Sequence, residues 1–424
     1  MADIIKRQIK EGITLYYIPD TKYKTVSMST YLNRKLKKSE ATTNALLSKL
    51  LTRGTENCRN MNLLSTYADE LYGTLYDVNI TKKAYVQSIV SSVNFLSDNY
   101  TKENIAKKCT ELMLDLLFKP NMEDGIFPSE VVRVEKQNLK DDIEGLINDK
   151  RSYANFRCIE EMCKGEENSI FEFGYLEDLE KIDEKSVSAH YKDIITRSPI
   201  DIFVVGNIDL DEFCGFISDY LGNYKFDISL LKPDSGMVRE AKEVNYAEDV
   251  FDVAQGKLAM GFTTGITIDD DKYYALLLAN SIYGSGAHSR LFNTVREKMS
   301  LCYYASSMLD KFRAVMLVSS GIEFENYEKA KSEIEKQLKN IADGDFTDEE
   351  LEVSRSFIIN SYLSYKDSSY AMKQYYRSQC FSSNHDTIDE AVEKVQKLTR
   401  QDVTDALSKV RLNTVYFLKG KVMQ

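Results

Sequence analysis

Residues 284–303 read GSGAHSRLFNTVREKMSLCY. The glycines at the start of this stretch indicate a loop, the run SRLFNTVREK indicates a helix, and the Leu-Cys-Tyr end is typical of the beginning of a strand. Two of its side chains, Arg296 and Tyr303, are seven positions apart. By residue type alone, Arg296 is a cation at the C-terminal end of a helix and Tyr303 is an aromatic core residue at a strand start.

The chain around this stretch repeats itself once. Ser152-Tyr153-Ala154 returns as Ser369-Tyr370-Ala371 about 217 residues later, and the apolar run at 202–206 returns at 415–418. Solenoid proteins have much shorter repeats, so a repeat of this length indicates two similar domains. A chain of 424 residues is also longer than one hydrophobic core usually supports.

Each copy of the repeat has the same predicted layout. An apolar strand opens the copy, at 13–18 in the first and at 258–262 in the second. The elements that follow are a helix (46–51 and 275–282), a hairpin-like pair of strands (ending at 85–90 and 314–318), several helices and a final strand. Because strands are grouped with helices and do not strictly alternate with them, we predict an α+β fold with a mostly antiparallel sheet in each domain.

The repeat also predicts the domain boundaries. The first domain is expected at 1–230 and the second at 246–424. The linker is expected at 231–245, because it begins with the run LKPDSG, which contains Pro and Gly.

Composition describes an acidic globular chain. The net charge is −11 and the pI is about 5.1, so the surface should repel phosphate backbones, and we expect no nucleic-acid partner. No apolar run is long enough for a membrane span, and the N-terminus turns polar before a signal-peptide core could form. We therefore expect a cytoplasmic protein without a membrane partner. The seven cysteines form no CxxC pair and are expected to be reduced thiols.

Histidine is scarce in this chain. His190, His288 and His385 are the three histidines, and no two of them lie at metal-ligand spacing on a helix. A zinc enzyme normally needs two or three nitrogen or sulfur ligands and an open coordination position. The sequence contains neither a GxSxG nucleophile motif nor a GxxxxGK[ST] phosphate loop.

The run at 284–303 resembles the C-terminal-domain signature of the insulinase/pitrilysin/processing-peptidase metallopeptidases, the inverzincins. That signature has a glycine-containing loop, SRLF, a VREK-like helix end and a Leu-small-Tyr strand start. Further similarity at 70–75 (ELYGTL), at 173–179 (FGYLEDL) and at the linker extends it over essentially the whole chain. The resemblance implies two homologous domains that form a clamshell around a central cavity.

The zinc half of that family's site is degenerate here. The family's first domain carries HxxEH on a helix, where the two His bind zinc and the Glu activates the water. Aligned on RGT at 53–55, which resembles the family's KGT, the ligand and base positions fall on Ala45, Ser48, Lys49 and Asp142, with Asp141 as the alternative to Asp142. We expect no metal or other cofactor in this chain. A lysine ammonium could replace the metal charge, so Lys49 is expected to approach one of the two aspartates.

The second-domain half of the site is present. In the family, an Arg and a Tyr seven positions apart contact the substrate carbonyl opposite the zinc, and they fall on Arg296 and Tyr303. A permanent cation and a phenol can both stabilise the negative charge that develops on that oxygen. The family usually has Gly where this chain has Ser300, so the turn before the strand departs from the pattern.

Dimeric family members divide the work between a subunit with HxxEH and a subunit with the Arg/Tyr pair. The resemblance implies that this chain is of the second kind, as in bacterial subunit pairs. It would be inactive alone, and it would bind a peptide or small protein substrate for cleavage or processing by a homologous HxxEH-bearing partner that holds the zinc. One alternative is a non-enzymatic peptide-binding or scaffold protein that kept the fold. Another is a stand-alone enzyme that uses His385 and Asp386.

Overall fold

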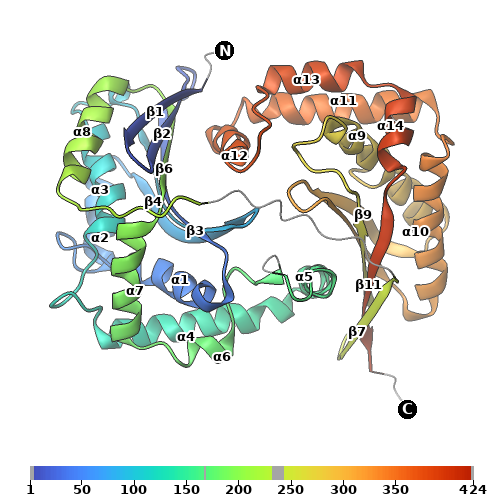
Figure 1. The fold of residues 1–424 in the computed structure, drawn as a ribbon, viewed down its shortest axis with the longest axis horizontal. Coiled ribbons are helices and arrows are strands. Elements are labelled where there is room, and N and C mark those ends of the chain that lie inside the picture. Colours follow the sequence, from blue (N-terminus) through green and yellow to red (C-terminus); the bar gives the residue numbers. More distant parts are fainter. Residues whose placement is uncertain (1–3, 167–168, 232–242, 422–424) are drawn as a thin grey trace. The chain divides into compact units, whose positions relative to one another are not determined.

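The structure is a computed structural model that describes residues 4–166, 169–231 and 243–421 (Figure 1). Contacts within the chain divide it into two compact units, and neither is one contiguous half of the sequence. Unit 1 is Met1–Glu144, Ile170–Asp234 and Ser368–Phe381, and unit 2 is Gly145–Ser169, Ser235–Asp367 and Ser382–Gln424. Most of the predicted linker, 231–245, lies at 232–242, outside the described residues.

Unit 1 is built on a six-stranded sheet with the order β1-β2-β6-β3-β5-β4. The strands are β1 (Ile5–Lys10), β2 (Ile13–Pro19), β3 (Thr25–Lys35), β4 (Leu75–Lys83), β5 (Val86–Leu96) and β6 (Ile200–Gly206). β2 and β6 run parallel, whereas the other neighbours run antiparallel. The sheet of unit 1 is therefore mostly antiparallel, as predicted.

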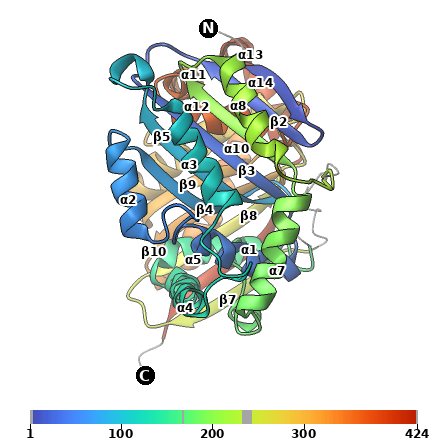
Figure 2. The ribbon, with the colours of Figure 1, turned by 90° about the vertical axis from the view of Figure 1, so that its left-hand side faces the viewer.

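Helices α1, α3, α7 and α8 contact the strands of this sheet, and Figure 2 shows α3, α7 and α8 in front of it. The helices of the first copy in unit 1 are α1 (Lys38–Leu51), α2 (Met61–Glu70), α3 (Ala106–Phe118), α4 (Ser129–Gly145), α6 (Leu176–Leu179), α7 (Glu184–Arg197) and α8 (Leu210–Gly222), with a 3-10 turn η1 (Asp98–Tyr100). Met28, Leu46, Leu114 and Ile202 are fully buried in the core between these helices and the sheet. Phe203 belongs to a separate apolar cluster, because neighbouring residues of a strand point to opposite faces.

Unit 2 is built on a five-stranded sheet with the order β7-β11-β8-β10-β9, in which β7 and β11 form the parallel pair. The strands are β7 (Asn245–Phe251), β8 (Gly256–Thr263), β9 (Cys302–Asp310), β10 (Val315–Ile322) and β11 (Arg411–Gly420). The helices are α5 (Lys150–Met162), α9 (Tyr273–Tyr283), α10 (Tyr327–Ala342), α11 (Asp348–Tyr365), α13 (Ile388–Lys397) and α14 (Arg400–Leu407), with the π-helix η4 (Leu291–Lys298) and the 3-10 turns η2 (Leu146–Asn148) and η5 (Phe324–Asn326). None of the helices in the described part of the chain is long and apolar enough to cross a bilayer.

The two sheets share one topology, which confirms the predicted duplication and the predicted fold class. The order β2-β6-β3-β5-β4 in unit 1 corresponds to β7-β11-β8-β10-β9 in unit 2. The predicted match between 13–18 and 258–262 is wrong, because β2 corresponds to β7, and β8 corresponds to β3. Hydrophobicity misses β7 since this edge strand carries Glu248 and Asp249, and its residues Asn245, Tyr246 and Val250 are exposed.

Each copy of the repeat contributes one helix to the unit that is built mainly from the other copy. Because of this exchange, the compact units differ from the contiguous domains predicted at 1–230 and 246–424. Helix α5 comes from the first copy but belongs to unit 2. There its Ala154 and Cys158 pack with Ala259, Leu317 and Tyr416 on the sheet. These contacts of α5 with the sheet are apolar.

Helix α12 (Ser369–Gln379) makes the reciprocal exchange, from the second copy into unit 1, and it inserts two cations. Lys373 and Arg377 are only 4% and 1% exposed. The Lys373 ammonium donates to the Ser29 hydroxyl (2.7 Å), and the Arg377 guanidinium donates to the Ser88 hydroxyl (2.8 Å). The Arg377 guanidinium carbon also lies 3.9 Å from the Tyr31 ring centroid. The face of the unit 1 sheet under α12 is therefore partly polar.

Candidate functional site

The degenerate zinc motif lies on α1, at positions that face the interior of unit 1. Ala45 and Ser48 are 1% and 3% exposed. The Ser48 hydroxyl donates to the backbone oxygen of Ala45 at 2.8 Å, so its proton is used within the helix. Neither position offers a nitrogen or carboxylate ligand for a metal.

The Lys49 ammonium forms an ion pair with Asp142 of α4. Its Nζ lies 2.6 Å from Asp142 Oδ2. Asp141 accepts a hydrogen bond from Gln137 Nε2 at 2.8 Å instead. The predicted approach of Lys49 to an aspartate is confirmed, and Asp142 is the partner.

A second ion pair lies beside the first and was not foreseen from the sequence. The Arg53 guanidinium pairs with Glu135, whose side chain is only 4% exposed. Lys49 lies in the last turn of α1 and Arg53 lies two residues beyond the end of that helix, whereas Glu135 and Asp142 are seven positions apart on α4. The seven-residue spacing places the two carboxylates on one face of α4, and this pattern could have revealed the acidic half of the double pair.

These residues do not fit a zinc ion. An ammonium lies against the carboxylate that the alignment assigns to the third ligand, Ala45 and Lys49 stand at the two His positions, and Ser48 stands at the position of the Glu. Within residues 4–166, 169–231 and 243–421, no group of three His, Cys, Asp or Glu side chains is arranged to hold a metal. The zinc half of the family site has therefore been replaced by cation–carboxylate pairs.

Arg296 lies in the last turn of the π-helix η4, which begins directly after the glycine-containing loop. The Met299 amide donates to the Thr294 carbonyl at 3.0 Å, a five-residue span that belongs to π-type winding. The Arg296 side chain is 38% exposed and lies 3.4 Å from Glu297. Its guanidinium carbon is 4.5 Å from the Phe292 ring centroid. Arg296 is thus a helix C-terminal cation, as residue type suggests, and it is also open to a ligand.

Tyr303 is not a core aromatic, because it is 52% exposed. It occupies a β-bulge: the pairing of β9 with β10 shifts from Tyr304 opposite Gly321 to Cys302 opposite Ile322, so Tyr303 has no partner across the ladder. Bulges change the direction of a side chain and occur often next to functional sites. A strand-start pattern in the sequence contains no signal for this extra residue.

The Tyr303 hydroxyl already has two hydrogen-bonding neighbours. It donates to Glu323 Oε1, and the side chain of Gln255 also hydrogen-bonds it. The hydrogen bond to Glu323 and the negative charge of that carboxylate raise the pKa of the phenol. The phenol therefore stays a neutral donor, as an oxyanion-binding group must.

Ser300 adopts the conformation for which the family uses glycine. Its φ is +51°, in the left-handed region that disfavours residues with a Cβ. The turn therefore keeps its geometry, at a cost in backbone strain.

We expect Ser300→Gly to raise the free energy of unfolding by about 0.5–1 kcal/mol, because glycine removes the strain but adds freedom to the unfolded chain. The matched control is Ser356→Gly on the exposed side of α11, which should lower it by about 0.5 kcal/mol. Urea unfolding of both variants measures the difference. Equal destabilisation by both changes would contradict a strained turn at Ser300.

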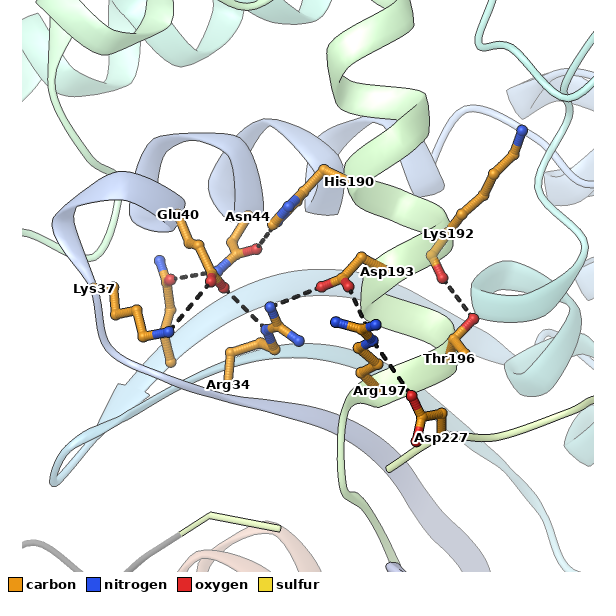
Figure 3. A network of polar contacts seen from close by, with 11 residues as sticks. Arg34, Lys37, Glu40, Asn44, His190, Lys192, Asp193, Thr196, Arg197 and Asp227 are labelled. Atoms are coloured by element: carbon orange, nitrogen blue, oxygen red, sulfur yellow. Dashed lines mark hydrogen bonds and ion pairs between the residues drawn. The ribbon is translucent and has the colours of Figure 1, made fainter. Parts of the chain in front are cut away.

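Figure 3 shows a polar network that fixes the start of α1. The Arg34 guanidinium donates to Glu40 at 2.9 Å and to Asp193 at 2.9 Å, which ties β3 to α1 and α7. His190 Nε2 lies 2.7 Å from Asn44 Oδ1, and burial lowers the pKa of this imidazole. His190 therefore has a structural hydrogen-bonding role in this network.

His288 and the Asp386 carboxylate also lie in packing contacts, whereas His385 is exposed. His288 Nε2 is 3.1 Å from the Ser281 hydroxyl, and its ring lies 4.9 Å from the Phe357 ring. Asp386 accepts hydrogen bonds from the Tyr274 hydroxyl (2.8 Å) and from the Lys394 ammonium (2.6 Å). The carboxylate that a stand-alone enzyme would require is thus engaged in helix packing.

Comparison with known proteins identifies the family. The "Peptidase M16 inactive domain" model matches residues 181–357. "Probable inactive metalloprotease YmfF" of Bacillus subtilis (strain 168) is 32% identical over 412 residues, which cover 96% of each chain. The chain belongs to the peptidase M16 family. It is an inactive M16 protein, in agreement with the loss of HxxEH from α1.

Solved structures resemble the chain over its whole length. A conserved protein from Enterococcus faecalis V583 has a TM-score of 0.92 and 27% identity, with 100% of both chains covered. A peptidase M16 inactive domain from Pseudomonas fluorescens has a TM-score of 0.81 at 17% identity, again with 100% of both chains covered, and shares the fold.

Proposed function

We propose that this M16 chain is the substrate-binding subunit of a heterodimeric zinc metallopeptidase whose partner is a homologous subunit with HxxEH. One observation carries the proposal: Arg296 and Tyr303 are both accessible on unit 2, although the zinc half of the site is gone. A scaffold would need neither side chain. The substrate would be a peptide or small protein, and the chain alone would not cleave it.

The chemistry of the two side chains supports this role. When a water attacks a peptide carbonyl, negative charge develops on the carbonyl oxygen, and a guanidinium and a phenol can both donate to it. Tyr303 now donates to Glu323, so the carbonyl oxygen would have to replace that carboxylate as the acceptor. The bulge leaves the ring exposed at the edge strand β9, where an incoming peptide can reach the hydroxyl.

The proposal is tested by purifying the chain alone and with its natural partner, followed by elemental analysis after dialysis. We expect no stoichiometric zinc in the isolated chain and about one zinc per heterodimer, because only the partner would supply a closed set of ligands. Peptide hydrolysis should require both subunits. About one tightly held zinc in the isolated chain would refute the proposal, and a partner without HxxEH would indicate a scaffold.

A further inference from the structure

An aromatic platform lies on the sheet of unit 2, beside Tyr303. Lys257 of β8, Gly321 of β10 and Tyr304 of β9 are register partners on three neighbouring strands, so their positions share one face. Gly321 has no side chain, and a Cβ built there would lie 2.4 Å from Tyr304 Cε1. The Tyr304 ring therefore lies over the backbone of β10, and any larger residue at 321 would displace it.

Two cations flank this ring. The guanidinium carbon of Arg151, in the first turn of α5, is 4.3 Å from the Tyr304 ring centroid, and the Lys257 ammonium is 5.8 Å from the same centroid. The Arg151 guanidinium donates to the Ser306 hydroxyl at 3.0 Å. The Lys257 ammonium donates to Gln255 Oε1 at 3.3 Å. Both acceptors are neutral.

Neither cation is neutralised by an ion pair with a carboxylate of the described residues. Burial and the nearby charge of Arg151 lower the pKa of Lys257. The Asp149 carboxylate raises the pKa of Lys257 but forms no ion pair with it. Asp149 caps α5 instead, because its carboxylate accepts hydrogen bonds from the Arg151 amide (3.1 Å), the Ser152 amide (3.1 Å) and the Ser152 hydroxyl (2.6 Å). Two neighbouring cations without an ion pair form a locally basic site on a chain of net charge −11.

We propose that Arg151, Lys257 and Tyr304 form an anion-binding platform that takes a carboxylate of the peptide substrate, an acidic side chain in particular. The planar guanidinium can bind a carboxylate through two parallel hydrogen bonds, and the ammonium adds a point charge. Arg151 is exposed and Lys257 is half-buried, so a ligand can reach both.

The platform is connected to the proposed oxyanion donor. Gln255 accepts from Lys257, and its side chain also hydrogen-bonds the Tyr303 hydroxyl. An acidic side chain held on the platform would therefore lie close to the carbonyl that Tyr303 contacts. This assignment rests on the proposed function and adds a substrate class to it, namely peptides with a Glu or Asp near the cleaved bond.

The test measures peptide binding to the isolated chain by fluorescence anisotropy. The probes are labelled peptides of one apolar sequence that contain a single Glu or a single Gln, each with a free or an amidated C-terminus. We expect the amidated Glu peptide to bind about 10-fold more tightly than the amidated Gln peptide, and the double variant Arg151→Gln/Lys257→Gln to abolish this difference. The control is Lys339→Gln on the exposed surface of α10, which should keep the difference. Thermal melts verify that each variant is folded.

Three outcomes would overturn the platform. The wild-type chain could bind the Glu and Gln peptides equally, the double variant could keep the full preference, or the preference could follow the free C-terminus and ignore the side chain. None of these measurements involves Arg296 or a partner subunit. Failure of the proposed function, seen as an unaffected cleavage rate in Arg296→Ala, therefore stays distinguishable from failure of the platform.

Discussion

Arg296→Ala is expected to lower kcat/KM of the reconstituted heterodimer by about 10²–10³-fold, and Tyr303→Phe by about 10²-fold, because each change removes one donor to the developing oxyanion. Both side chains are exposed, so their loss should leave the fold intact. Tyr303→Phe removes only the hydroxyl, with its hydrogen bonds to Glu323 and Gln255. Peptide hydrolysis by the purified pair measures the effect, with thermal melts and co-purification as controls for folding and pairing.

The matched control for the phenol is Tyr246→Phe, at an exposed tyrosine on β7, the opposite edge strand of the same sheet. It should leave the rate unchanged. Wild-type turnover in both Arg296→Ala and Tyr303→Phe would mean that this chain contributes structure to its partner and no chemistry.

Arg53→Met should lower the free energy of unfolding by about 3 kcal/mol, the lower end of the range for breaking a buried ion pair, because Arg53 itself is partly solvated. The variant leaves the Glu135 carboxylate buried with Asn138 Nδ2, at 3.1 Å, as its remaining hydrogen-bond donor. The double variant Arg53→Met/Glu135→Met should recover most of the loss, since it also removes the buried charge. Urea unfolding of the two variants measures both values.

Lys49→Met is the internal comparison for that experiment. Asp142 is 47% exposed, so water can solvate its carboxylate when the ammonium is removed, and we expect a loss of no more than about 1 kcal/mol. If Arg53→Met cost no more than Lys49→Met, the burial of Glu135 would not determine the energetics of the degenerate site.

Structural features that depend on residue types and on their spacing in the chain could be predicted from the sequence. The loss of the metal ligands at Ala45 and Lys49, the repeat of Ser152-Tyr153-Ala154 and the approach of Lys49 to an aspartate all follow from residue types and their spacing along the chain, and the structure agrees with each. Hydrophobic periodicity reveals that a helix face is buried, but it contains no information on which sheet buries it. The exchange of α5 and α12 was therefore not predictable from the pattern.

The same limit applies to the site. The bulge at Tyr303 arises from how β9 pairs with β10, and the meeting of Arg151 with Tyr304 depends on the transfer of α5 to unit 2. The roles of Arg296 and Tyr303 are implied by the resemblance to the family, whereas residue type alone places Tyr303 in the core. The structure corrects the second assignment through exposure and leaves the first as the proposal.

The exchanged helices also bear on the ancestry of the chain. A single copy of the repeat would leave the sheet face under its missing helix uncovered. With two copies, each copy covers the other's sheet with one helix, as the subunits of a domain-swapped dimer do. The present chain has the form of such a dimer fused into one polypeptide. A substitution at Lys373 or Arg377 in the second copy therefore changes the stability of the sheet formed by the first copy. The two halves of the gene cannot diverge independently at these positions.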